Sequence, residues 1–184
     1  MGKQNKISMR IKIDETLQLE LIAENHAETI FNIVNNCRPY LKKWLPWVDF
    51  TVSVDNTMNF IKSSLKRHSE NNGFDFVIIF NNDVVGVIGL PAVDHANKTT
   101  SIGYWLGEKF QGHGIMTKAC KALTEYCFDS LELNRVVINC ATENFDSQAI
   151  PERLNFTKEG TCKQGEFLNG KFVDYYVYSR LRNA

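Results

Sequence analysis

The chain has 184 residues with 21 basic and 21 acidic side chains, so its formal net charge is zero. A neutral chain has no overall field that would attract nucleic acid or an anionic membrane, and we expect neither as a partner. Its apolar and charged fractions are typical of globular proteins, and its length is most simply one domain over residues 1–184. We find no membrane-spanning apolar run and no signal peptide, so we expect a cytoplasmic protein.

The cysteine count is odd, and the spacings match no zinc-binding pattern. The cysteines are Cys37, Cys120, Cys127, Cys140 and Cys162. We interpret them as small apolar core residues of a reducing compartment, and we expect no metal site.

The first third of the chain is predicted to form paired strands and then a helix. Apolar residues alternate with polar ones over 7–22, which indicates extended structure. Apolar residues at helical spacing follow over 23–36, where Asn25 is a candidate N-cap and Glu28 a matching capping-box acid.

Residues 37–50 are aromatic-rich and are interrupted by Pro39 and Pro46. One interpretation is a loop fixed to the core by its tryptophans, Trp44 and Trp47. The other is a wall of a binding pocket. The residues favour neither, and both interpretations stay open.

The middle of the chain predicts a helix and three strands. The helix covers 54–71, and the strands cover 74–80, 84–93 and 99–106. The helix carries a run of basic residues that we expect to be solvated, namely Lys62, Lys66, Arg67 and His68.

A glycine-bearing turn joins the last of these strands to an amphipathic helix that begins at or just after Gly114. The first N–H groups of a helix lack intrahelical partners and lie at the positive end of its dipole, so a phosphate fits there when glycine lets it approach. Two glycines also fit a plain connection. The turn is not a Walker A loop, and Thr117 stands where a dinucleotide loop has its third glycine.

The last third predicts a strand over 135–141, a helix over 144–154 and a closing hairpin of strands 157–166 and 171–179. Together the elements indicate a mixed α/β sheet with helices packed on its faces. The unit from 99 to 141 must then be a parallel strand–helix–strand crossover.

Two motifs resemble those of the GNAT family of N-acetyltransferases. The segment Gln111-x-x-Gly114-x-Met116 is similar to the family's acyl-CoA pyrophosphate loop, although Met116 replaces the usual Gly or Ala. The segment from Asn144 to Phe156 is similar to a second family motif, with Asn155 in place of a glycine. The strand Tyr104-Trp105-Leu106 and the turn resemble the branch that acetylates ribosomal proteins, the RimL/RimJ type, and the similarity extends from about Leu17 to Arg180.

The resemblance implies the GNAT fold, a twisted and mostly antiparallel sheet with one parallel strand–helix–strand unit and helices on both faces. It implies acetyl-CoA as co-substrate. The cofactor-binding residues that it implies are Trp105, Leu106, Gln111, Gly112, His113, Gly114, Ile115, Met116, Thr117, Asn144 and Ser147.

The resemblance also implies catalytic roles. Ser147 is the candidate general acid near the CoA sulfur, and Glu166 is the candidate base, acting directly or through water. Trp44 and Trp47 would line the acceptor side. Each catalytic residue also has a plainer interpretation, since Ser147 fits a helix-turn hydroxyl and Glu166 a polar residue at a strand end.

These features predict an acetyl-CoA-dependent N-acetyltransferase that acts on the α-amino group of a protein N-terminus. Two alternatives stay open. The acceptor is a small amine such as a polyamine or an antibiotic, or the chain is a CoA-binding regulatory module without turnover. A homodimer is compatible with any of these functions.

Overall fold

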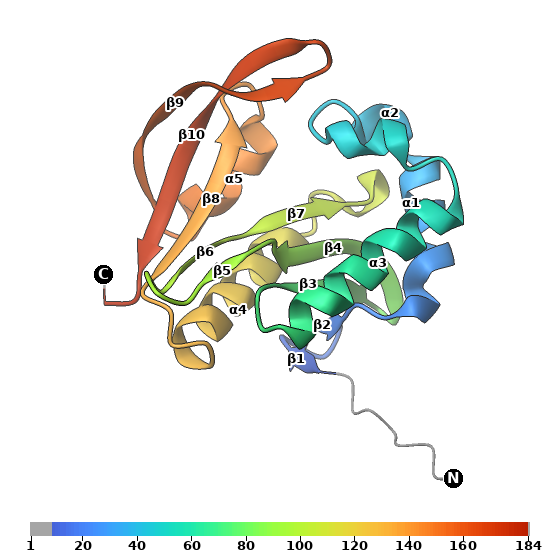
Figure 1. Cartoon of the computed structure of the whole chain (residues 1–184), viewed down its shortest axis with the longest axis horizontal. Coiled ribbons are helices and arrows are strands. Elements are labelled where there is room, and N and C mark those ends of the chain that lie inside the picture. Colours follow the sequence, from blue (N-terminus) through green and yellow to red (C-terminus); the bar gives the residue numbers. More distant parts are fainter. Residues whose placement is uncertain (1–8, 184) are drawn as a thin grey trace, which may run out of the picture.

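The computed structural model describes residues 9–183. Its strands are β1 (Arg10–Lys12), β2 (Leu17–Leu21), β3 (Phe74–Phe80), β4 (Asp83–Leu90), β5 (Val93–Asp94), β6 (Thr99–Ser101), β7 (Gly103–Leu106), β8 (Arg135–Ala141), β9 (Thr157–Leu168) and β10 (Lys171–Leu181). They form two five-stranded sheets, in the orders β1-β2-β3-β4-β7 and β5-β6-β8-β10-β9 (Figure 1). The predicted strand pair at the N-terminal end is confirmed for residues 9–22, and its first two residues lie outside the described part.

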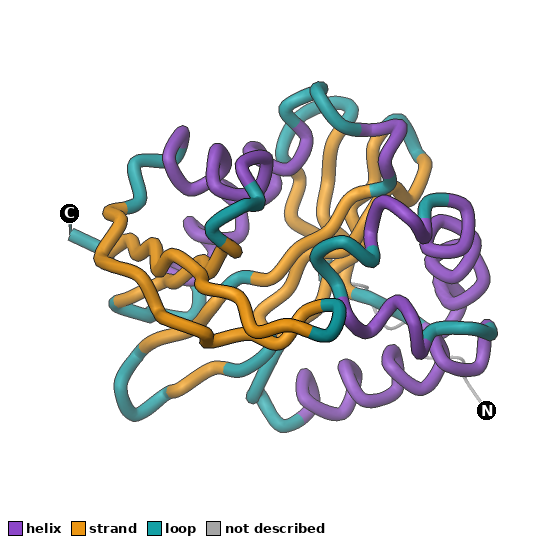
Figure 2. Tube along the Cα trace, turned by 90° about the horizontal axis from the view of Figure 1, so that it is seen from above, coloured by secondary structure: helices purple, strands orange, loops and turns teal. Residues whose placement is uncertain are grey.

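Helices cover both faces of the first sheet (Figures 1 and 2). The helices are α1 (Ala27–Asn36), α2 (Arg38–Leu41), α3 (Val54–Ser69), α4 (Ile115–Asp129) and α5 (Phe145–Arg153), with 3-10 turns η1 (Glu24–His26), η2 (Pro46–Phe50) and η3 (Glu108–Phe110). In β3, Val77 packs with α1 and α3, whereas Phe76 and Ile78 pack in the core cluster that contains α4. This double burial explains why β3 is apolar on both faces.

The start of α1 differs from the prediction. The helix begins at Ala27, after the 3-10 turn that contains Asn25, and its N-cap position is His26 without a side-chain cap bond. The Nδ1 atom of His26 instead accepts a hydrogen bond from the Ala23 N–H at 3.1 Å. The predicted capping by Asn25 and Glu28 is therefore wrong, because the 3-10 turn includes Asn25 and moves the N-cap position one residue later, to His26.

The predicted strand 99–106 is two strands in the structure. β6 pairs in parallel with β8, while β7 pairs antiparallel with β4 in the other sheet. At the branch the Ile102 N–H donates to the Val137 carbonyl at 2.8 Å, and beyond it β7 and β8 belong to different sheets. The predicted parallel crossover is present as β6–α4–β8, and the divergence of β7 from β8 opens the space that becomes the site.

Two residues of the predicted basic face are not solvated as expected, since Arg67 and His68 are half-buried and the His68 ring packs against Phe74 with centroids 5.2 Å apart. Arg67 Nη2 donates to the Asp75 carboxylate at 2.6 Å, and Ser64 Oγ donates to the same oxygen at 2.6 Å. Asp75 lies inside β3 and is only 7% exposed. A buried carboxylate needs such partners because its desolvation is costly, so this part of the face of α3 is structural.

Replacing Gly89 with alanine should destabilise the fold. Gly89 pairs with Asp75 across β4 and β3, and a Cβ there would overlap the Asp75 carboxylate and lie 2.7 Å from the Phe74 carbonyl oxygen. Overpacking of this kind costs about 1–3 kcal/mol. The check is urea unfolding of Gly89→Ala beside Gly160→Ala, where a Cβ meets nothing within 4 Å. Equal midpoints for the two variants would contradict the prediction.

Candidate active site

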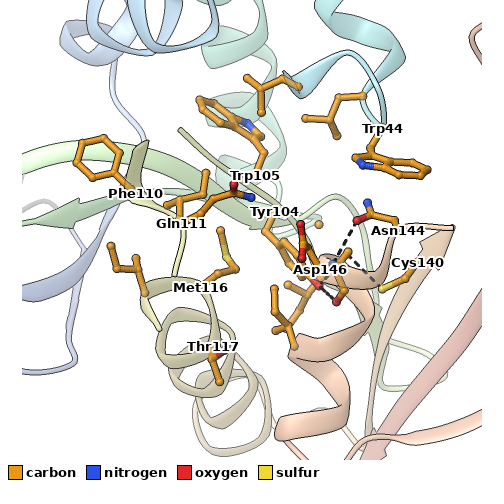
Figure 3. Close-up of a pocket in the computed structure, with 18 of the residues that line it drawn as sticks. Trp44, Tyr104, Trp105, Phe110, Gln111, Met116, Thr117, Cys140, Asn144 and Asp146 are labelled. Carbon is orange, nitrogen blue, oxygen red and sulfur yellow. Dashed lines mark hydrogen bonds between the residues drawn. The ribbon is translucent and has the colours of Figure 1, made fainter. Parts of the chain in front are cut away.

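A cavity of about 840 Å³ opens where β7 and β8 diverge. Its lining comes from α2 and the residues after it, from β7, from the glycine turn and first turns of α4, and from the ends of β8 and the first turns of α5 (Figure 3). Glu166 of β9 completes the lining. We call this cavity the cleft.

The glycine turn at one end of the cleft has an open backbone. Gly112 has φ +78° and Gly114 has φ +70°, conformations that favour glycine, and Gly114 is the N-cap of α4. A Cβ at either residue would meet nothing within 4 Å, so the space in front of the turn is free. The predicted helix start is confirmed, and a helix N-terminus that is reachable through two glycines suits an anionic phosphate.

The side chains of this turn divide into two groups. Ile115 and Met116 are buried and pack in the core, and both also line the cleft. Gln111 lines the cleft, and its Nε2 donates to the Tyr40 hydroxyl at 2.6 Å. His113 is exposed and does not line the cleft.

Strand β7 presents one free edge to the cleft. Among residues 9–183 it is the last strand of its sheet and pairs only with β4, while its residues from Gly103 to Leu106 line the cavity. Main-chain N–H and C=O groups on such an edge need hydrogen-bond partners. An amide-bearing chain or a carbonyl oxygen lying along β7 would supply them.

Asn144 and Ser147 meet at the start of α5. The Ser147 N–H donates to Asn144 Oδ1 at 3.2 Å, which confirms Asn144 as the N-cap. Ser147 Oγ lies 3.2 Å from Tyr104 Oη and 3.3 Å from Cys140 Sγ. The hydroxyl therefore sits in the cleft, between β7 and β8.

Glu166 is half-buried on β9, in the sheet opposite the one that contains β7, and its residue lines the cleft. Desolvation raises the pKa of its carboxyl group, because burial disfavours the charged form. A carboxylate with a raised pKa is a better proton acceptor near neutral pH than an ordinary glutamate. Asp146, in the first turn of α5, is a second carboxylate in the lining, and it is exposed.

Residues 16–157 match the family model described as the acetyltransferase (GNAT) domain. The chain belongs to this family. The ribosomal-protein-serine acetyltransferase of Escherichia coli (strain K12) is 34% identical over 171 residues, which are 93% of this chain and 96% of that protein.

Two solved acetyltransferases have closely similar structures. RimL, a ribosomal alpha-N-protein acetyltransferase solved with coenzyme A, gives a TM-score of 0.91 at 32% identity, with 94% of this chain and 98% of that chain covered. The microcin self-immunity acetyltransferase MccE, solved with acetyl-CoA and AMP, gives 0.90 at 33% identity, with 93% and 95% covered. The predicted GNAT fold and N-acetyltransferase class are confirmed.

Both interpretations of residues 37–50 hold in this acetyltransferase. Leu41 and Val48 are buried and fix the segment to the core, while Tyr40 and Trp44 line the cleft. Trp47 does not line it, and its ring packs against Trp105 with centroids 6.0 Å apart. Of the two tryptophans predicted on the acceptor side, only Trp44 faces the cavity.

The hairpin of β9 and β10 extends toward the same segment (Figures 1 and 2). At its tip, Asn169 Nδ2 donates to the carbonyls of Lys42 and Lys43, each at 3.2 Å. This contact connects the strand that carries Glu166 to the wall that carries Trp44. These two flanks of the cleft are thereby held together.

Sequence reasoning did not assign a role to Tyr104, Cys140 or Asp146, which all line the cleft. Their positions carried a usable signal, since Cys140 lies at the end of a predicted strand and Asp146 lies inside the second motif. Within residues 9–183 no three His, Cys, Asp or Glu side chains are grouped as a metal site. No helix of that same range has the length and apolarity needed to cross a bilayer.

Proposed function

We propose that this acetyltransferase transfers the acetyl group of acetyl-CoA to the α-amino group of a protein N-terminus. The observation that carries the proposal is the cleft itself, whose lining includes both an open helix N-terminus and a half-buried carboxylate, Glu166. The 34% identity to a ribosomal-protein-serine acetyltransferase over 93% of the chain supports the acceptor class.

The cofactor would follow the cleft from the glycine turn to Ser147. The N–H groups around Gly112 and Gly114 would bind the pyrophosphate, assisted by the helix dipole. The free edge of β7 and the Asn144 side chain would hold the pantetheine amides. This path leaves the thioester near the Ser147 hydroxyl, between β7 and α5.

Acetyl transfer then requires two proton movements. The acceptor nitrogen bonds to the thioester carbon and loses a proton to Glu166, directly or through a water molecule. A main-chain N–H on β7 would stabilise the oxyanion of the tetrahedral intermediate. When the C–S bond breaks, Ser147 donates a proton to the sulfur, so CoA leaves as a thiol. Glu166 then releases its proton to solvent, and the serine is reprotonated from solvent.

The net charge of the cleft lining favours one class of acceptor amine over another. Its lining contains two carboxylates, Asp146 and Glu166, and two cations, Lys118 and Arg153, so their formal charges cancel. A polyamine with several positive charges would favour a markedly acidic pocket. A single α-amine carries at most one positive charge, so one nearby carboxylate is enough.

We expect peptides with a small N-terminal residue to be better acceptors than spermidine. The measurement is thiol release from acetyl-CoA over a panel of peptides, polyamines and one amine linked to a nucleotide, included because MccE was solved with AMP. The same peptides with a blocked N-terminus are the control and should give only background release. A clear preference for spermidine or the nucleotide-linked amine would contradict the proposal. Binding of acetyl-CoA without thiol release for any acceptor would indicate a regulatory module.

A further inference from the structure

The Tyr104 side chain connects the two walls of the cleft (Figure 3). Tyr104 lies on β7, where it pairs with Ile88 of β4. Its hydroxyl oxygen lies 3.0 Å from the Ser147 carbonyl and 3.2 Å from Ser147 Oγ, both on α5. One tyrosine therefore contacts both the carbonyl and the hydroxyl of the serine from the opposite wall.

The donors and acceptors of this contact can be assigned. A carbonyl oxygen only accepts, so the Tyr104 O–H donates to the Ser147 carbonyl and uses its one hydrogen there. In the second contact the Ser147 hydroxyl must then be the donor and Tyr104 Oη the acceptor. The Cys140 thiol, 3.3 Å from Ser147 Oγ, is left to donate to the serine oxygen.

Burial keeps both neighbours of Ser147 protonated. It raises the pKa of the Tyr104 hydroxyl well above its ordinary value, and it raises the pKa of the Cys140 thiol. Both groups therefore stay neutral donors across the physiological pH range. The Ser147 hydroxyl is held on one side by an acceptor and on the other by a donor, which fixes its rotamer.

We propose that Tyr104 is a positioning residue for the reaction, because its hydroxyl sets the orientation of the Ser147 hydroxyl and its distance from β7. The inference rests on the proposed role of Ser147 as the proton donor to the departing sulfur. In that role the serine hydrogen turns from Tyr104 Oη to the sulfur as negative charge develops there. Tyr104 keeps its bond to the Ser147 carbonyl, so α5 and β7 stay in register while the proton moves.

This role predicts an effect on turnover rather than on binding. The oxyanion donor would come from β7 and the proton donor from α5, and the Tyr104 hydroxyl is the side-chain link between them. Without it, acetyl-CoA still binds along the same surfaces, but Ser147 is less often aligned with the sulfur. A merely structural role would instead lower acetyl-CoA affinity and melting temperature together.

The test is a double-mutant cycle of Tyr104→Phe and Ser147→Ala, with Tyr126→Phe as the matched control. Tyr126 is a tyrosine of α4 that does not line the cleft, and its hydroxyl contacts Met9 Sδ at 3.9 Å. We expect Tyr104→Phe to lower kcat about 5- to 10-fold, as for the loss of one neutral hydrogen bond, with KM for acetyl-CoA changed less than about twofold. In the Ser147→Ala background the same change should cost no further activity. Rates are referred to the amount of protein that binds CoA, so partial unfolding of a variant does not imitate a kinetic effect.

Tyr104→Phe at the wild-type rate, beside a slow Ser147→Ala, would overturn the inference and leave the proposed function standing. Losses that multiply in the double variant would also overturn it, since Tyr104 would then act independently of Ser147. Ser147→Ala at the wild-type rate would overturn the acid assignment itself and the inference with it. The proposal is supported if Tyr126→Phe has wild-type kinetics, Tyr104→Phe has a lowered kcat, and the double variant is no slower than Ser147→Ala.

Discussion

Replacing Glu166 with glutamine should lower kcat by about 10²–10⁴-fold, the usual effect of losing a general base. Glutamine keeps the size and the hydrogen bonding of the side chain, but it cannot accept a proton from the acceptor amine. Acetyl-CoA affinity, measured by calorimetry, should change little, because Glu166 is on β9 and not on the glycine turn, β7 or α5, which are proposed to hold the cofactor.

The pH dependence of the wild-type rate should also reveal the titration of Glu166. Because burial raises the pKa of Glu166, the working carboxylate is present above that raised pKa and is lost as the pH falls through it. The acceptor α-amine, with a pKa near 7.7–8.0, also loses reactivity on acidification. The amine loses reactivity equally with the wild type and with Glu166→Gln. The difference between the pH–rate profiles of these two proteins therefore isolates the acidic limb due to Glu166.

The melting temperature is an independent measure of the effect of burying the Glu166 carboxylate. Burial disfavours the ionised carboxylate, so at neutral pH the glutamine variant should melt at the same temperature as the wild type or higher. The advantage should vanish at low pH, where Glu166 is protonated and neutral. A residue that lowers stability while it raises turnover is typical of an active site.

Asp146→Asn is the matched control for the base. Asp146 is the other carboxylate of the cleft lining, and it is exposed. We expect its replacement to leave the acidic limb in place. Loss of that limb in Asp146→Asn, with full activity in Glu166→Gln, would move the role of base to Asp146. Full activity in both variants would indicate that water alone deprotonates the amine.

Replacing Gly114 with aspartate should weaken acetyl-CoA binding by about 10²-fold. A carboxylate about 5 Å from one phosphate charge costs about 3 kcal/mol at an effective dielectric constant of 20. The fold has room for the side chain, since a Cβ at Gly114 meets nothing within 4 Å. The loss should shrink at high salt, which screens the repulsion.

Gly114→Asn separates charge from shape and backbone strain. Asparagine has nearly the same shape as aspartate, and both tolerate the left-handed conformation of Gly114, at φ +70°. We expect the asparagine variant to bind acetyl-CoA much more tightly than the aspartate variant, as measured by titration calorimetry. Equal affinities in the two variants would show that no phosphate lies against the turn.

The sequence by itself determined the features that depend on local backbone chemistry. The start of α4 at Gly114 and the cap at Asn144 followed from residue types that suit those positions wherever the chain goes. The same holds for Asn155, whose φ of +58° is the left-handed conformation expected of an asparagine at a helix end. Together with the two motifs they sufficed to predict the family.

Only the tertiary structure decided which segments meet. Residues 99–106 look like one strand because apolar content does not show a change of partner at Ile102, yet this change opens the cleft. Arg67 and Asp75 pair because α3 packs on β3, a contact that helical periodicity cannot reveal.

Tertiary packing also decided why Trp44 lines the cleft and Trp47 does not. They are three residues apart in an irregular segment, where no helical or strand period assigns a direction to each side chain. Trp47 packs against Trp105 and does not line the cleft, whereas Trp44 lines it. The contact of Tyr104 with Ser147 joins residues 43 positions apart. It exists because β7 and α5 face each other across the gap between the two sheets, an arrangement set by long-range packing.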